Sequence, residues 1–139
     1  MPRKRILSVG QCSADHWSIS RTIEKRFLAE VVRAGTSDEA VAMLQRQAFD
    51  LVLVNRILDS DGSNGLEVVK RVQAEERLRH VPVMLVSNYE EAQQEAVGAG
   101  AVRGFGKDSL GRPSMMALLK PFLEQAEEAR ASSLEPKGD

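Results

Sequence analysis

The sequence predicts an α/β fold in which helices cover both faces of a parallel sheet. Short apolar runs alternate along the chain with amphipathic segments, and this alternation is typical of parallel strands joined by right-handed crossover helices. Two of the runs, residues 49–54 and 81–86, are almost wholly apolar, as expected of strands that are covered on both faces. We therefore expect five strands and five helices around one sheet.

The first expected strand, residues 5–10, is a short apolar run that ends at Gly10. The helix expected over residues 16–27 repeats an apolar side chain every four residues, which places one stripe in the core. That stripe consists of Ile19, Ile23 and Phe27. Asp15 precedes this helix and is a candidate for its N-cap, because a carboxylate accepts hydrogen bonds from the first free amides of a helix.

The second strand is expected over residues 29–34. Thr36 or Ser37 then provides an N-cap for a second helix. The residues that this helix turns inward are Ala40, Val41 and Leu44. The run 49–54 is the expected central strand, and the loop over residues 55–65 is dense in turn-forming residues.

The second half of the chain repeats the alternation with weaker signals. A helix with Leu66, Val69 and Val72 on one side precedes the strand over residues 81–86. A helix over residues 89–97 should end at Gly98 or Gly100. Residues 101–106 form a weak fifth strand that is interrupted by glycine.

The last helix is expected from Pro113 towards Arg130, since proline is favoured in the first turn of a helix. Pro121 lies inside that pattern and predicts a kink or two short helices, because proline removes a backbone donor. We expect one domain over residues 1–130 and a flexible tail over residues 131–139.

The composition fits one globular domain, since 139 residues suffice for a single core. The net charge of -1 gives no electrostatic reason to bind nucleic acid. The single cysteine excludes an internal disulfide and fits a reducing compartment. The apolar stretch near the N-terminus is too short for a signal peptide or a membrane-spanning helix. We expect a cytoplasmic protein with no membrane or nucleic-acid partner.

In doubly wound folds the functional crevice lies beyond the carboxyl ends of the strands. Five residues fall at such ends: Gly10, Gln11, Asn55, Ser87 and Lys107. They are the candidate site residues. The chain shows no recognisable arrangement of nucleophile, base and orienting acid, so an enzyme is not expected.

Several segments resemble the receiver domain of bacterial response regulators, over about residues 4–124 and in the family's order and spacing. They are residues 27–40, 49–54, 65–69, 81–87, 99–101 and 107–110. The resemblance implies a flavodoxin-like (CheY-like) fold, which is a doubly wound five-stranded parallel sheet with strand order 2-1-3-4-5 and five helices. It also implies a role in two-component or phosphorelay signalling.

In that family, two acidic residues after the first strand and an aspartate after the third strand hold magnesium, and the aspartate accepts a phosphoryl group. Gly10, Gln11 and Asn55 stand at those positions, so all three carboxylates are missing. Oxygen-rich acidic ligands are what magnesium selects, and we therefore expect no metal and no cofactor. The family's hydroxyl residue and lysine persist as Ser87 and Lys107.

A second departure affects the family's switch, an aromatic residue that lies three positions before the lysine. That position is Gly104 here. Phe105 is adjacent, but neighbouring residues of a strand point to opposite faces, so it does not replace the aromatic. The resemblance with these departures predicts a pseudo-receiver that acts by binding a signalling protein, such as a histidine kinase or an effector, without phosphorylation.

Other interpretations stay open. The chain could keep residual or noncanonical phosphorylation in a phosphorelay, or it could be a flavodoxin-like binder of a small anion or flavin. A homodimer through the face of the fourth helix, fifth strand and fifth helix is a further expectation from the family. The sequence leaves open whether Asp15, Asp59 or Asp61 recruits a cation, and whether Cys12 is redox active.

Overall fold

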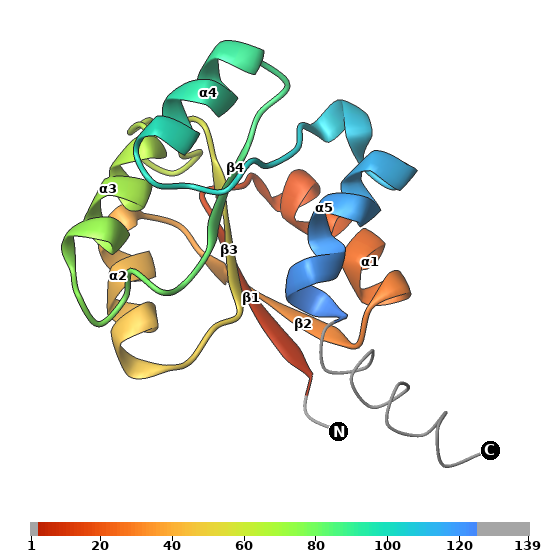
Figure 1. Cartoon of the computed structure of the whole chain (residues 1–139), viewed down its shortest axis with the longest axis horizontal. Helices are drawn as coiled ribbons and strands as arrows, with labels where there is room; N and C mark the ends of the chain where they lie inside the picture. Colours follow the sequence, from red (N-terminus) through yellow and green to blue (C-terminus); the bar gives the residue numbers. More distant parts are fainter. Residues whose placement is uncertain (1–2, 125–139) are drawn as a thin grey trace.

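The computed structural model describes residues 3–124, and Figure 1 shows its central sheet between two groups of helices. The elements in chain order are β1 (Lys4–Val9), α1 (Ser13–Arg26), β2 (Ala29–Ala34), α2 (Ser37–Arg46), β3 (Leu51–Asn55), α3 (Leu66–Ala74), β4 (Val83–Val86), α4 (Glu90–Gly98), the short 3₁₀ helix η1 (Lys107–Ser109) and α5 (Pro113–Leu123).

The four strands form one parallel sheet in the order β2-β1-β3-β4. The predicted α/β fold, its parallel sheet and its five helices are confirmed. In register, Val9 lies beside Val54, and Asn55 lies beside Val86. The carboxyl ends of β1, β3 and β4 therefore meet at one edge of the molecule, where the candidate residues lie.

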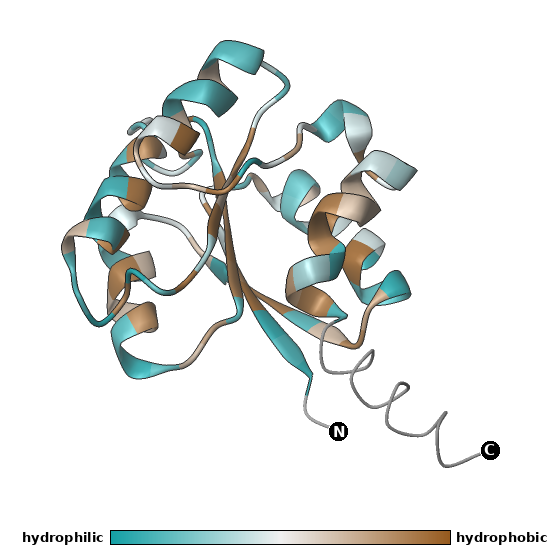
Figure 2. Ribbon diagram, in the orientation of Figure 1, coloured by the Kyte–Doolittle hydropathy of each residue, from teal (hydrophilic) through white to brown (hydrophobic). Residues whose placement is uncertain are grey.

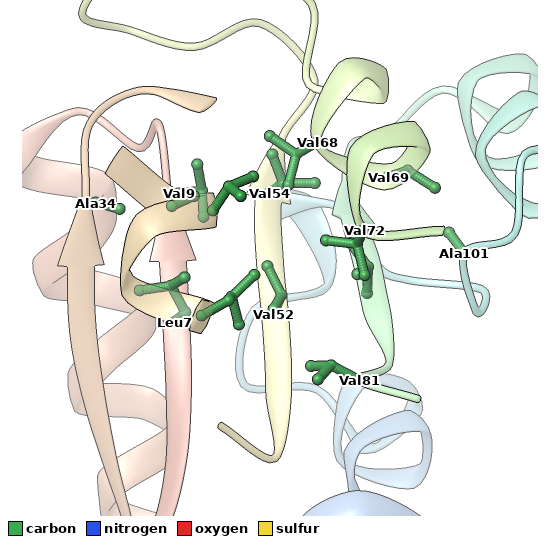
Figure 3. Close-up of a cluster of buried hydrophobic side chains, with 14 of the residues drawn as sticks. Leu7, Val9, Ala34, Val52, Val54, Val68, Val69, Val72, Val81 and Ala101 are labelled. Carbon is green, nitrogen blue, oxygen red and sulfur yellow. The ribbon is translucent and has the colours of Figure 1, made fainter. Parts of the chain in front are cut away.

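Each face of the sheet has its own apolar core. On one face, α2, α3 and α4 pack on the strands, and on the other face α1 and α5 do so (Figure 1). The middle of the sheet is hydrophobic, whereas the first residues of β1 and the outer sides of the helices are hydrophilic (Figure 2). Figure 3 shows Val9 and Val54 from two adjacent strands close to Val68 of α3, and all three side chains are fully buried.

The caps of the first two helices differ in how well the sequence predicts them. Thr36 caps α2 as expected, and its hydroxyl accepts a hydrogen bond from the Glu39 amide at 3.1 Å. Asp15 does not cap α1, which begins at Ser13. The thiol of Cys12 accepts the bond from the Asp15 amide at 3.4 Å instead. The Asp15 carboxylate is thereby free for another contact.

The expected fifth strand, residues 101–106, is reduced to an isolated parallel bridge between Met84 and Val102. The cause is Gln93 of α4, whose side chain is only 3% exposed. Its Nε2 donates to the Leu85 carbonyl at 2.9 Å, and its Oε1 accepts from the Gly104 amide at 2.9 Å. A regular parallel ladder would join these two backbone groups directly, so the inserted amide ends the pairing.

Pro121 does not divide the last helix, which runs without a break over Pro113–Leu123. Proline removes one amide donor of the helix, but α5 still continues to Leu123. The prediction of two short helices is therefore wrong. The expected continuation towards Arg130, the domain end at residue 130 and the tail over residues 131–139 lie outside the described residues.

Candidate functional site

Three of the predicted site residues line one pocket at the carboxyl ends of β3 and β4. Asn55, Ser87 and Lys107 border a pocket of about 220 Å³. Ser87 is held beside the 101–106 segment because its amide donates to the Phe105 carbonyl at 3.0 Å. The structure thus brings these three residues together, as the parallel topology predicts.

The side chain of Asn55 donates hydrogen bonds to nearby backbone carbonyls. Its Nδ2 donates to the Ile57 carbonyl at 2.8 Å and lies 3.4 Å from the Gly10 carbonyl. Both contacts use the amide as a donor, which a carboxylate at this position could not do. The side chain therefore ties the start of the loop after β3 to the end of β1, and it carries no nucleophilic oxygen anion.

Lys107 forms an ion pair with Asp15 of α1. The Nζ atom lies 2.6 Å from the Asp15 Oδ2, and both side chains are a little more than one third exposed. The hydrogen bond from Lys107 lowers the pKa of Asp15 below its ordinary value, and burial opposes this effect. The lysine charge is neutralised by a carboxylate from the first helix rather than by one from the end of β3.

The end of β1 is filled by the loop that follows β3. Gly10 has a φ of 75°, and a Cβ atom there would lie 2.3 Å from the Cδ2 of Leu58. Leu58 is fully buried, and the amide of Asp59 donates to the Gly10 carbonyl at 2.9 Å. An acidic side chain at position 10 would therefore clash with Leu58 and strain the backbone.

Gln11 lies beneath the surface rather than in the pocket. Its side chain is 2% exposed, and neither its Oε1 nor its Nε2 has a hydrogen-bond partner among the described residues. Its carbonyl accepts a hydrogen bond from Arg33 at 3.2 Å. The structure thus separates Gly10 and Gln11 from the pocket that Asn55, Ser87 and Lys107 share.

These residues do not fit the magnesium ion that the receiver family binds. Magnesium prefers carboxylate oxygens and nearly octahedral geometry, but the three corresponding positions hold a glycine, a buried amide and an amide that donates hydrogen bonds. Within residues 3–124, no group of three or more His, Cys, Asp or Glu side chains is placed to hold a metal ion.

The rim of the pocket carries exposed side chains that sequence reasoning did not select. Tyr89 is 62% exposed, and Ile57 is 38% exposed. The guanidinium of Arg56 lies over the Tyr89 ring, 5.2 Å from its centroid. The Tyr89 amide donates to the Ser87 hydroxyl at 3.1 Å, which places the ring next to the pocket. No periodic pattern marks such loop residues, so the sequence offers no signal for them.

The switch position, Gly104, is held by α4 and by the loop before it. Besides Gln93, the carboxylate of Glu90 pairs with Arg103, and the Oδ1 of Asn88 accepts from the Asp108 amide at 3.0 Å. Gln93 also donates to the Ser87 carbonyl at 3.0 Å. We call Asn88, Glu90 and Gln93 the clamp residues, because they tie α4 and the loop before it to residues 103–108.

The remaining candidates do not join this pocket. Asp59 and Asp61 are exposed, and hydrogen bonds from Ser63 lower the pKa of Asp61. The free thiol of Cys12 serves as the helix cap described above. Phe105 is buried with the side chains of α1 and α5 rather than at the position of the family's switch. No helix within the described residues is long and apolar enough to cross a membrane.

Comparison with known proteins identifies the family of the chain. Residues 16–120 match the response regulator receiver domain. Chemotaxis protein CheY-3 of Vibrio cholerae serotype O1 is 29% identical over 118 residues, which cover 80% of this chain and 85% of that protein. The polar-differentiation response regulator DivK of Brucella ovis is 26% identical over 98 residues, 70% of this chain and 78% of that protein.

The solved structures agree with this identification of the fold. Chemotaxis protein CheY4 of Vibrio cholerae has a TM-score of 0.73 at 22% identity, with 88% of this chain and 100% of that chain covered. NtrX from Brucella abortus also reaches a TM-score of 0.73, at 20% identity, and 95% of this chain covers 29% of that longer chain. The chain belongs to the response regulator receiver domain family, the signalling modules of two-component systems.

Proposed function

We propose that this receiver domain is a pseudo-receiver, which signals in the cytoplasm by binding another signalling protein without accepting a phosphoryl group. Phosphoryl transfer brings several negative charges together and needs a cation to neutralise them. On this proposal no magnesium site operates, and the domain is not an enzyme. A histidine kinase or an effector is the expected type of partner.

The observation that carries the proposal is the position of Leu58 against Gly10. Loss of carboxylates alone leaves a space that water or an ion could fill, but here a buried leucine occupies the space beside position 10. The Asp15 carboxylate neutralises Lys107 at the same time. These contacts support a pocket whose state does not depend on phosphorylation.

A magnesium titration followed by amide NMR tests this proposal. In the wild-type protein, we expect no saturable change in the resonances of Gly10, Gln11 and Asn55 at millimolar MgCl₂. A receiver domain that keeps all three carboxylates of the family is the positive control, and it should show saturable changes. Saturable binding by the wild-type protein with the affinity of this control would contradict the proposal.

A further inference from the structure

We propose that the pocket formed by Asn55, Ser87 and Lys107 binds an acidic side chain of a partner protein. This inference rests on the proposed function, because it names the chemistry of the protein that the pseudo-receiver would bind. It goes beyond that function by assigning a contact surface, which consists of the pocket and of its rim residues Arg56, Ile57 and Tyr89.

The charges that border the pocket favour an anion. Lys107 and Arg56 line it, and none of the described residues that line it is acidic. Asp15 lies within hydrogen-bond distance of one Lys107 hydrogen, and an ammonium group has three donors, so two remain. Arg56 forms no ion pair with the described residues. A carboxylate in this pocket would therefore meet the guanidinium of Arg56 and the two remaining donors of Lys107.

The hydrogen-bonding groups suit a carboxylate as well. The Ser87 oxygen accepts from the Tyr89 amide, which leaves the hydroxyl hydrogen available to a ligand. A carboxylate accepts several hydrogen bonds, and bonds to a charged acceptor are about twice as strong as neutral ones. Lys107 and Ser87 can thus donate to one carboxylate while Asn55 keeps its bond to Ile57.

The apolar rim indicates a protein rather than a nucleic acid. Tyr89 and Ile57 expose 62% and 38% of their surface beside the pocket, and Arg56 stacks on the Tyr89 ring. Tyrosine and arginine are enriched among the residues that dominate protein interfaces. A nucleic acid would need an extended basic surface, whereas the net charge of the chain is -1.

The test is an amide NMR titration of the full chain with two probes. The acetylated, N-methylamidated dipeptide Leu-Glu presents a carboxylate beside an apolar side chain, and the matching Leu-Gln dipeptide is its neutral control. We expect Leu-Glu to cause saturable shifts at Ser87, Asn88 and Tyr89, and Leu-Gln to cause none.

Two lysine variants locate the contact. Lys107→Met should weaken binding of the Leu-Glu dipeptide roughly tenfold, the loss expected for one charge-assisted hydrogen bond. Lys120→Met is the matched control, because Lys120 also lies near a carboxylate, 4.0 Å from that of Glu124 at the end of α5. That variant should bind the dipeptide as the wild-type protein does.

Three outcomes would overturn the inference. They are absence of saturable shifts with Leu-Glu, equal binding of Leu-Glu by both lysine variants, and tighter binding of inorganic phosphate or of a single-stranded oligonucleotide at the same amides. The proposed function fails on a different observation, namely uptake of a phosphoryl group measured by intact mass. The two failures are therefore distinguishable.

Discussion

The charged groups at the carboxyl edge of the sheet are arranged differently from those in the family pattern. The carboxylate beside Lys107 comes from Asp15 on α1, 92 positions away along the chain. The position at the end of β3 holds an amide that donates to its own loop. An ion pair between α1 and η1 thus replaces the pairing expected from the family.

The ion pair predicts a pH-dependent difference in stability between the wild-type protein and Lys107→Met. Because Lys107 lowers the folded-state pKa of Asp15, the pair stabilises the fold above the unfolded pKa of about 3.9 and loses this effect as pH falls through the folded pKa. At neutral pH the variant should lose roughly 0.2–1 kcal/mol, the range for solvent-screened pairs.

Urea denaturation at neutral and acid pH measures this difference, and a carboxyl NMR titration of Asp15 measures the pKa. In Lys107→Met the pKa of Asp15 should rise towards its ordinary value. An unchanged Asp15 titration in the variant would show that Lys107 is not its partner in solution.

Gly10 predicts a second effect at the residue scale. A left-handed backbone costs a non-glycine residue about 1–2 kcal/mol, and at Gly10 the added Cβ also meets Leu58. Gly62 is a matched control, since its φ is 71° and nothing lies within 4 Å of the added Cβ. Gly10→Ala should therefore lower the free energy of unfolding more than Gly62→Ala. Equal losses in urea denaturation would contradict the steric contact.

Among the elements, α4 and the segment after it depart furthest from a regular receiver sheet. Gln93 occupies the backbone groups that would pair Leu85 with Gly104. A Cβ at Gly104 would lie 2.3 Å from the Leu85 carbonyl oxygen, so glycine permits this close approach. Gly104 and the Gln93 side chain thus contact the same stretch of backbone around Leu85.

Gln93→Leu tests this cause, with Gln94→Leu as its control. The first variant leaves the Leu85 and Ser87 carbonyls and the Gly104 amide without their partner, and each such buried group costs about 1–3 kcal/mol. The two fully buried groups, the Leu85 carbonyl and the Gly104 amide, together predict a loss of roughly 2–6 kcal/mol and faster hydrogen exchange at Gly104. Gln94 is exposed and bonds only to Glu90 in the described part, so its variant should resemble the wild-type protein. Unchanged exchange at Gly104 in Gln93→Leu would show that the clamp does not hold this segment.

The elements that the sequence predicted well are those whose apolar residues recur at the spacing of a strand or a helix and are buried in the structure. The apolar runs that became β1 to β4 and the stripe of α1 are of this kind. The glycines of residues 101–106 predict a weak fifth strand, but not that a glutamine from another element takes its backbone partners. The contacts of Asp15 with Lys107 and of Leu58 with Gly10 could not be predicted either, since they join residues that are distant in the sequence.

At the scale of the whole molecule, one apolar core lies on each face of a four-stranded parallel sheet (Figure 1, Figure 2). The adjacent parallel strands β3 and β4 bring Asn55 and Ser87 together, and the bond between Ser87 and Phe105 places Lys107 beside them. The receiver fold is thus present, while Gly10, Gln11 and Asn55 stand where the family pattern has carboxylates.

Intact mass after incubation with acetyl phosphate and magnesium tests the central claim most directly. A receiver domain with all three carboxylates serves as the positive control, and Asn55→Asp as the matched variant. The positive control should gain one phosphoryl group, whereas the wild-type protein and Asn55→Asp should gain none, because residues 10 and 11 supply no metal-binding acid. A gain of one phosphoryl group by the wild-type protein would contradict a phosphorylation-independent module.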